Sequence, residues 1–350
     1  MRKFIKDKYK VLLLCMFVLF GMAACSNPRG TDGKNKADQI IASEEMVIDK
    51  DQVNISDISN EQIREELENT PGDTITIEPT SWSQAWSNGW FEGLIVWPIA
   101  QLINWFASFT DAGWGIILAT LVIQLIIYAF SYKTQLAQQR MQEIQPQLER
   151  IQDKYKGKND ERSRMLMAQE TQKLYNDYDI HPFGTILVTF IQLPVMMGMF
   201  YATMRAATTV IGSFMGIPLS ETPLDGFRNL QWGPIVVYLL MIVMSIVSMM
   251  LPKWLKKLQD KKDGINQKKY DQPKGGMMSS TMNMTMYMTT AMISLMYISW
   301  PIAMSFYWLV SSVIRSGLSV VSHVISDKQE KEKKLNQKAD PGILKNRVKK

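Results

Sequence analysis

Three strongly polar side chains lie inside stretches that are otherwise apolar enough to cross a membrane: Gln124, Gln192 and Arg315. Hydrocarbon does not solvate an amide or a guanidinium, and an arginine at mid-span costs roughly 2.5–3.5 kcal/mol on translocon-based scales. Such groups therefore face other helices or a water-filled cavity. Their presence indicates a function inside the membrane.

Each of these three residues belongs to a stripe of polar residues spaced three or four apart, which places members of a stripe on one helix face. The stripes are Thr120, Gln124, Tyr128 and Ser131; Thr185, Thr189, Gln192 and Thr203; and Ser311, Ser312, Arg315 and Ser319. Hydrogen bonds between packed helices explain any one stripe equally well. The three together favour a hydrated surface within the membrane.

The chain lacks the residue patterns of common catalytic and metal sites. Its two histidines, His181 and His323, are far apart, and no His or Cys pair has metal-ligand spacing. It contains no glycine-rich phosphate loop. The predicted spans also hold no Asp or Glu in their cores. We therefore expect neither an enzyme nor an ATP-driven machine, and no metal or cofactor.

The elements that must position the polar residues are long apolar helices. The chain has 350 residues, of which 46% are hydrophobic, and these gather into blocks. Each block approaches the roughly 20 residues needed to cross a bilayer core. The predicted spans are 115–132, 183–204, 232–252, 281–299 and 301–323. We expect an all-α polytopic membrane protein with five transmembrane helices.

The N-terminal residues 1–24 have a basic start, an apolar core and small residues before Cys25. This order resembles a bacterial lipoprotein signal peptide, after which the cysteine is acylated and becomes the mature N-terminus. Met22 stands where leucine is usual, and an uncleaved anchor or an ordinary signal peptide are the alternatives. Residues 25–80 are acidic and poor in aromatics, so we expect a disordered extracytoplasmic tether with one short helix near 59–69.

Two further segments flank the first span. Residues 81–110 carry tryptophans interleaved with aliphatic residues, which is typical of a membrane–water interface, and we expect an external interfacial helix over 93–109. Residues 133–180 show apolar residues at helical spacing on both sides of a polar turn. This pattern predicts a charged helical hairpin.

The distribution of basic residues predicts the topology through the positive-inside rule. Loop 253–280 has eight Lys against three Asp, and tail 324–350 has nine basic and four acidic residues, whereas loop 205–231 has no bias. We therefore expect the lipid-anchored N-terminus outside the plasma membrane. The hairpin, the basic loop and the C-terminal tail are expected in the cytoplasm.

Three sequence blocks resemble the YidC/SpoIIIJ family of membrane protein insertases, in the lipidated five-span form of Gram-positive bacteria. The block 144–155 (IQPQLERIQDKY) is similar to the start of that family's cytoplasmic hairpin. The block 181–205 (HPFGTILVTFIQLPVMMGMFYATMR) is similar to its second span. The block 300–309 (WPIAMSFYWL) is similar to the start of its last span.

The resemblance implies five helices around a hydrophilic groove that passes hydrophobic segments of nascent membrane proteins into the lipid. Its implied partners are these nascent chains, membrane lipids, the Sec translocon and the ribosome, the last through the basic loop and tail. The implied groove and substrate-contact residues are Thr120, Gln124, Tyr128, Thr189, Gln192, Tyr307, Trp308, Ser311, Ser312 and Arg315.

One departure from the family concerns charge, because its first span usually carries an arginine at the position of Gln124. Among the predicted spans, Arg315 is the cation that lies well inside a span. Either its guanidinium supplies the positive charge of the groove, or it extends to the headgroups of the inner leaflet. A small-solute transporter or channel is the alternative function, since it would also need polar stripes. A lipid-anchored scaffold would not need polar groups at the span centres.

Overall fold

The computed structural model describes residues 28–158, 160–178, 182–262, 284, 287–288, 290–292 and 294–339. The chain forms two compact units, and each is described by itself. The first comprises the described residues up to Ile126 with Thr189–Met244 and Met292–Ser311. Four long helices contribute residues to both units: α5 (Ala112–Tyr155), α7 (Pro182–Arg205), α10 (Trp232–Lys262) and α12 (Ile302–Ala339).

Residues 28–80 are folded, so the expectation of a disordered tether is wrong for this segment. Its elements are β1 (Asn35–Lys36), η1 (Ala37–Gln39), β2 (Met46–Asp49), η2 (Lys50–Gln52), β3 (Val53–Asn54), α2 (Glu61–Asn69) and β4 (Thr74–Ile77). Strand β1 pairs in parallel with β3, and β2 pairs antiparallel with β4. Helix α2 confirms the short helix that was predicted, with Asn60 as its N-cap.

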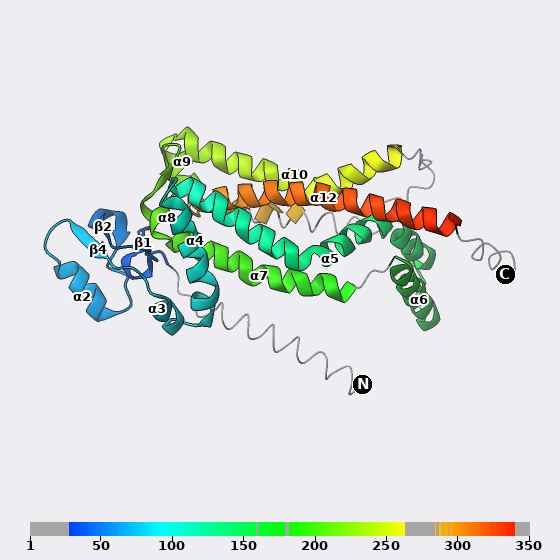
Figure 1. Ribbon diagram of the computed structural model, residues 1–350, viewed down its shortest axis with the longest axis horizontal. Coiled ribbons are helices and arrows are strands. Elements are labelled where there is room, and N and C mark those ends of the chain that lie inside the picture. Colours follow the sequence, from blue (N-terminus) through cyan, green and yellow to red (C-terminus); the bar gives the residue numbers. More distant parts are fainter. Residues whose placement is uncertain are drawn as a thin grey trace, which may run out of the picture. The chain divides into compact units, whose positions relative to one another are not determined.

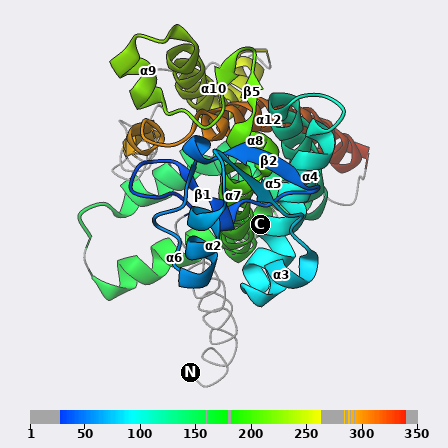
Figure 2. The same ribbon diagram turned by 90° about the vertical axis from the view of Figure 1, so that its left-hand side faces the viewer.

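A small apolar core holds this segment together although its surface is acidic. Ile48, Ile58 and Ile75 are at most 2% exposed, and they pack with Ala207 and Val210 from a distant part of the chain. Fully burying one such aliphatic side chain contributes roughly 1.5–3 kcal/mol. Figure 2 shows these strands and α2 facing the viewer, in front of α7 and α8.

Residues 81–110 are mostly helical, but in three short pieces rather than the one helix expected over 93–109. These are α3 (Trp82–Ser87), the π-helix η3 (Glu92–Val96) and α4 (Trp97–Ala107). Ser81 and Gln84 form a capping box at the start of α3. A Cβ at Gly93 would lie 2.6 Å from Trp86 Cε3, so glycine permits the close packing of η3 on α3. A position at a membrane surface remains a prediction.

Helix α4 crosses the direction of α5 and α7 and packs closely on both (Figure 1). Two glycines allow the approach. A Cβ at Gly115 of α5 would lie 2.7 Å from Ile103 O of α4, and one at Gly198 of α7 would lie 2.3 Å from Ile95 Cγ2 of η3 and 3.4 Å from Ile99 Cδ1 of α4. The core around these contacts includes Tyr307, which is 2% exposed.

The predicted external loop 205–231 has structure of its own. It contains α8 (Ala207–Ile211), β5 (Ser213–Phe214), β6 (Ile217–Pro218) and α9 (Pro223–Asn229). Thr222 caps α9 by accepting a hydrogen bond from the Asp225 N–H, and α9 ends at Leu230 in the left-handed conformation (φ 54°). The β5–β6 pair is antiparallel.

Among the described residues, three of the predicted spans correspond to helices that are long and apolar enough to cross a membrane. These are Ala112–Phe130, Trp232–Gln259 and Ile302–Lys328. Helix α7 covers the predicted span 183–204, but the side chains of 182–193 are not described. Span 281–299 falls only partly within the described residues, so the count of five remains a prediction.

In the second unit, two helical arms form a hairpin, as the spacing predicts, while its cytoplasmic location remains a prediction. Its first arm is the end of α5, which continues from the span without a break, and its second arm is α6 (Glu161–Asp177). Ile144 and Leu174 form the apolar contact between the arms. Lys154 Nζ lies 2.5 Å from Glu170 Oε1, to which Tyr155 also donates a hydrogen bond at 3.0 Å.

Three predicted segments lie wholly or partly outside the described residues. They are the signal segment 1–24 with Cys25, the basic loop 253–280 from residue 263 onward, and the tail beyond residue 339. The part of the tail up to Ala339 continues α12 as a helix. Residues 253–262 of the predicted loop belong to α10, so this helix continues beyond the predicted span 232–252.

Candidate functional site

The polar stripe of α5 lies inside the helix packing of the first unit. Thr120 is fully buried and Gln124 is 7% exposed. Gln124 Nε2 donates a hydrogen bond of 3.4 Å to the hydroxyl of Ser311 on α12, which is also fully buried. Two predicted stripes therefore meet directly at this point. The contact has the form of an interhelical hydrogen bond.

The second unit brings α5 and α12 together again through Tyr128. Its hydroxyl lies 3.3 Å from Ser322 Oγ, and Ser322 is 3% exposed. Ser322 was missed in the sequence, because the predicted stripe ended at Ser319. It continues the same spacing, three residues beyond Ser319, so the period itself could have located it.

Arg315 is half-buried in the second unit. Its Nη2 donates a 3.0 Å hydrogen bond to Ser312 Oγ, one turn earlier on α12, and Ser312 is fully buried. Ser319 is half-buried on the same helix. The cation therefore lies on a serine-lined stripe inside a candidate membrane span.

The aromatic pair near the start of α12 belongs to the first unit. Tyr307 is 2% exposed, while Trp308 is half-buried. Trp308 packs against Tyr297, with ring centroids 5.5 Å apart, and its ring centroid lies 6.3 Å from that of Tyr307. Tyr307 is thus part of the core, and only Trp308 of the pair retains exposed surface.

Three predicted residues are not placed in detail. Thr189 and Gln192 lie on α7, but their side chains are outside the described set. Cys25 precedes the first described residue. The lipid anchor and the second stripe therefore remain predictions.

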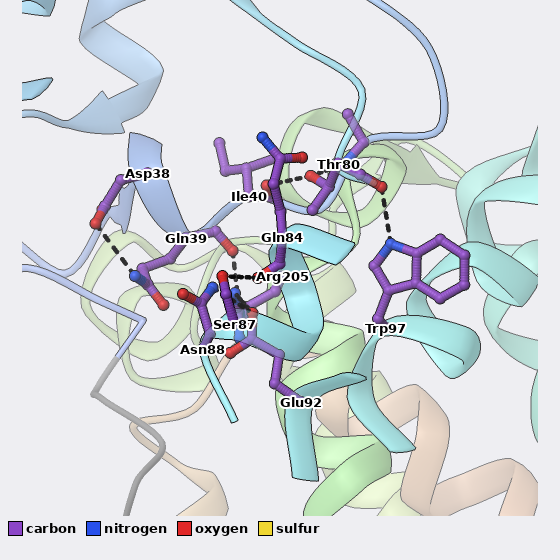
Figure 3. Close-up of polar contacts among 11 residues, drawn as sticks. Asp38, Gln39, Ile40, Thr80, Gln84, Ser87, Asn88, Glu92, Trp97 and Arg205 are labelled. Carbon is purple, nitrogen blue, oxygen red and sulfur yellow. Dashed lines mark hydrogen bonds and ion pairs between the residues drawn. The ribbon is translucent and has the colours of Figure 1, made fainter. Parts of the chain in front are cut away.

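A buried ion pair between Arg205 and Glu92 was not predicted from the sequence (Figure 3). Arg205 Nη2 lies 2.8 Å from Glu92 Oε1, and their side chains are 5% and 8% exposed. The signal that could have found it is the isolation of each charge: Glu92 lies among aromatic and aliphatic residues, and Arg205 ends an apolar helix. Buried charges are usually paired.

The described residues contain no group of three His, Cys, Asp or Glu side chains that could hold a metal ion. On the polar stripes, the described groups are the Gln124 amide with hydroxyls in the first unit, and the Arg315 guanidinium with hydroxyls in the second. Most of these groups are buried in helix contacts, where Gln124 pairs with Ser311 and Arg315 with Ser312.

The sequence profile of the 60Kd inner membrane protein family matches residues 105–332. Membrane protein insertase YidC 1 of Streptococcus pyogenes serotype M6 is 29% identical over 229 residues, covering 65% of this chain and 72% of that protein. Membrane protein insertase YidC 1 of Listeria monocytogenes serotype 4b is 27% identical over 249 residues, covering 70% of this chain and 77% of that protein.

Membrane protein insertase YidC of Bifidobacterium longum is 40% identical over 129 residues, which is 36% of either chain. The family profile covers well over half of the sequence and includes α5, α7, α10 and most of α12. The chain belongs to the 60Kd inner membrane protein family, the YidC/SpoIIIJ family.

Proposed function

We propose that this protein is a membrane protein insertase that takes hydrophobic segments of nascent proteins from the cytoplasm into the lipid bilayer. The observation that carries the proposal is the family match over 105–332, which includes the helices bearing Gln124 and Arg315. The relatives named above carry the same activity in their names. The chain acts alone or with the Sec translocon, and the ribosome delivers substrate near the basic loop and tail.

The physical basis of insertion is a polar path inside the membrane. Moving a polar flank of a nascent chain through hydrocarbon is costly because its groups lose their hydrogen bonds to water. A hydrophilic groove lined by amides, hydroxyls and Arg315 lowers this barrier. Burial of the new apolar segment in lipid then supplies the driving force, so the process needs no nucleotide hydrolysis.

Arg315 provides the positive charge of the groove in place of the family arginine that is replaced by Gln124. Its contact with Ser312 and its partial exposure support this role. A charge in this position attracts acidic flanks of substrates. The competing arrangement is that the guanidinium extends to lipid headgroups, in which case its removal would not change substrate preference.

Complementation of an insertase-depleted strain tests both levels of the proposal. The native chain should restore growth and insertion of small membrane proteins, and failure to do so would refute the insertase function. Arg315→Ala should lose insertion of substrates with acidic flanks, and adding Gln124→Arg should restore it. Arg315→Lys, which keeps the charge, is the matched control. Normal insertion of acidic substrates by Arg315→Ala would refute the relocated charge alone.

The topology follows from the same proposal: a lipidated Cys25 outside, and the hairpin 133–180 inside the cell. Mass spectrometry of the purified protein should find a diacylglycerol adduct on Cys25, whereas an intact Met1 terminus would contradict lipidation. Protease should cut the hairpin in inverted vesicles and leave it intact in protoplasts. Cleavage from outside would overturn this orientation.

A further inference from the structure

The end of α7 is completed by residues from the N-terminal segment. The last carbonyls of a helix have no donor within the helix. Here Asn35 Nδ2 donates to Met204 O at 2.7 Å, and the backbone N–H of Ile41 donates to Arg205 O at 2.7 Å. Both donors lie more than 160 residues away in sequence. The segment therefore acts as a cap for α7.

The guanidinium of Arg205, the last residue of α7, also contacts residues that precede α4 in the chain (Figure 3). Arg205 Nε donates to the backbone carbonyl of Gln39 at 2.6 Å, and its Nη2 pairs with Glu92. Asn88 Nδ2 donates a further hydrogen bond to Glu92 Oε1 at 3.1 Å. Each charge thus has more than one partner, as a buried ion pair requires.

Asn104 of α4 connects the N-terminal segment to α8. Its Nδ2 donates to Ile41 O at 2.8 Å, while its Oδ1 accepts from the N–H and hydroxyl of Thr208 at 3.2 and 2.8 Å. The Ala207 N–H also donates to Ile41 O at 3.0 Å. Asn104 is 3% exposed and Ile41 fully buried, so this network excludes water.

We propose that these residues form an N-terminal clamp that seals the Arg205 end of the first unit against water. The clamp consists of Asn35, Gln39, Ile41, Glu92 and Asn104. All five precede residue 105, where the match to the family profile begins, so the clamp is built from residues outside that match. In this protein, the clamp closes the end of the helix bundle at Arg205.

The residues beneath the clamp show what it covers. Ala202 and Thr203, on the last turn of α7, are fully buried. Removing Glu92 would leave the Arg205 guanidinium without its carboxylate in an apolar setting. A buried charge that loses its partner recruits water or moves toward it. Water would then reach the last turn of α7.

Thiol accessibility of a Thr203→Cys reporter tests the seal in the full chain, reconstituted in proteoliposomes with a membrane-impermeant maleimide. A chain without the reporter gives the background labelling rate. With the native clamp, the reporter should react no faster than this background. With Glu92→Gln or Asn35→Leu, it should react at least tenfold faster.

Two controls separate sealing from general destabilisation. Glu61→Gln breaks the exposed Arg64–Glu61 pair of the same segment and should leave labelling unchanged. Glu92→Met combined with Arg205→Met removes both charges, so labelling should return toward the native rate.

Native-like labelling in both Glu92→Gln and Asn35→Leu would overturn the clamp, as would fast labelling in Glu61→Gln. If Glu92→Gln does not accumulate in membranes, the labelling rate of the reporter in Asn35→Leu tests the clamp instead, because this change removes only a neutral hydrogen-bond donor. The test reads accessibility alone. Its failure is therefore distinct from failure of the insertase proposal.

Discussion

The hydrogen bond between Gln124 and Ser311 offers a direct test of whether the α5 stripe serves packing or insertion. The perturbation is a double-mutant cycle with Gln124→Leu and Ser311→Ala. Leucine keeps most of the glutamine volume, so the core around α5 retains its packing. The cycle isolates the energy of this one contact.

The structure sets the expected magnitude. The bond joins two neutral groups at 3.4 Å, beyond the usual 2.7–3.2 Å range of N–H···O bonds. Hydrogen bonds between membrane helices average about 0.6 kcal/mol and reach about 1.7 kcal/mol. We therefore expect a coupling energy at or below about 0.6 kcal/mol. Insertion by Gln124→Leu should nevertheless fall, because the amide is needed as a polar lining.

The coupling energy is measured from unfolding in mixed micelles by titration with a denaturing detergent, and insertion is measured by complementation. Ser311→Ala alone is the control, since it removes the contact but leaves the amide. A coupling energy above about 1.7 kcal/mol would refute the reasoning. Normal insertion by Gln124→Leu would also refute it, and would assign the stripe to packing.

Two further predictions concern close packing and acid sensitivity. Gly198→Ala should destabilise the protein by about 1–3 kcal/mol in the same detergent titration, because its Cβ would lie 2.3 Å from Ile95 Cγ2. Gly317→Ala is the control: its Cβ would have nothing within 4 Å, so it should be neutral or stabilise the protein by up to about 1 kcal/mol. In the hairpin, hydrogen bonds from Lys154 and then Tyr155 hold the pKa of Glu170 below its ordinary value. The stability that Glu170 contributes is therefore present above the unfolded pKa and is lost as pH falls through the folded one. The protection factors of the α6 amides, which correct for the intrinsic pH dependence of exchange, should fall in acid in the native chain and lose that pH dependence in Glu170→Gln. An unchanged dependence in the variant would contradict this assignment.

The local sequence pattern predicted an element correctly where hydropathy or residue spacing repeats along a single helix. The apolar runs predicted α10 and the spanning parts of α5 and α12, because hydropathy over about 20 residues is a property of adjacent residues. The spacing of Ile144 and Leu148 likewise predicted an arm of the hairpin. The stripe on α12 was found by its period, although Ser322 was left out.

Composition misled where a few apolar residues are scattered among many charges. Residues 28–80 were expected to be disordered because acidic residues dominate them. Their core uses Ile48, Ile58 and Ile75, which follow no helical or strand period along the whole segment, and it is completed by Ala207 and Val210. Such a core is assembled from distant positions, so no window of sequence displays it.

The order of the described apolar helices, the helical hairpin and the family were determined by the sequence, because hydropathy, periodicity and motif order are local or linear properties. Tertiary structure decided which polar groups meet. Gln124 lies against Ser311 across 187 residues, and Asn35 lies against Met204 across 169. Partners of this kind are selected by burial, since each buried donor or charge must find an acceptor, and that requirement is met only when the chain is folded.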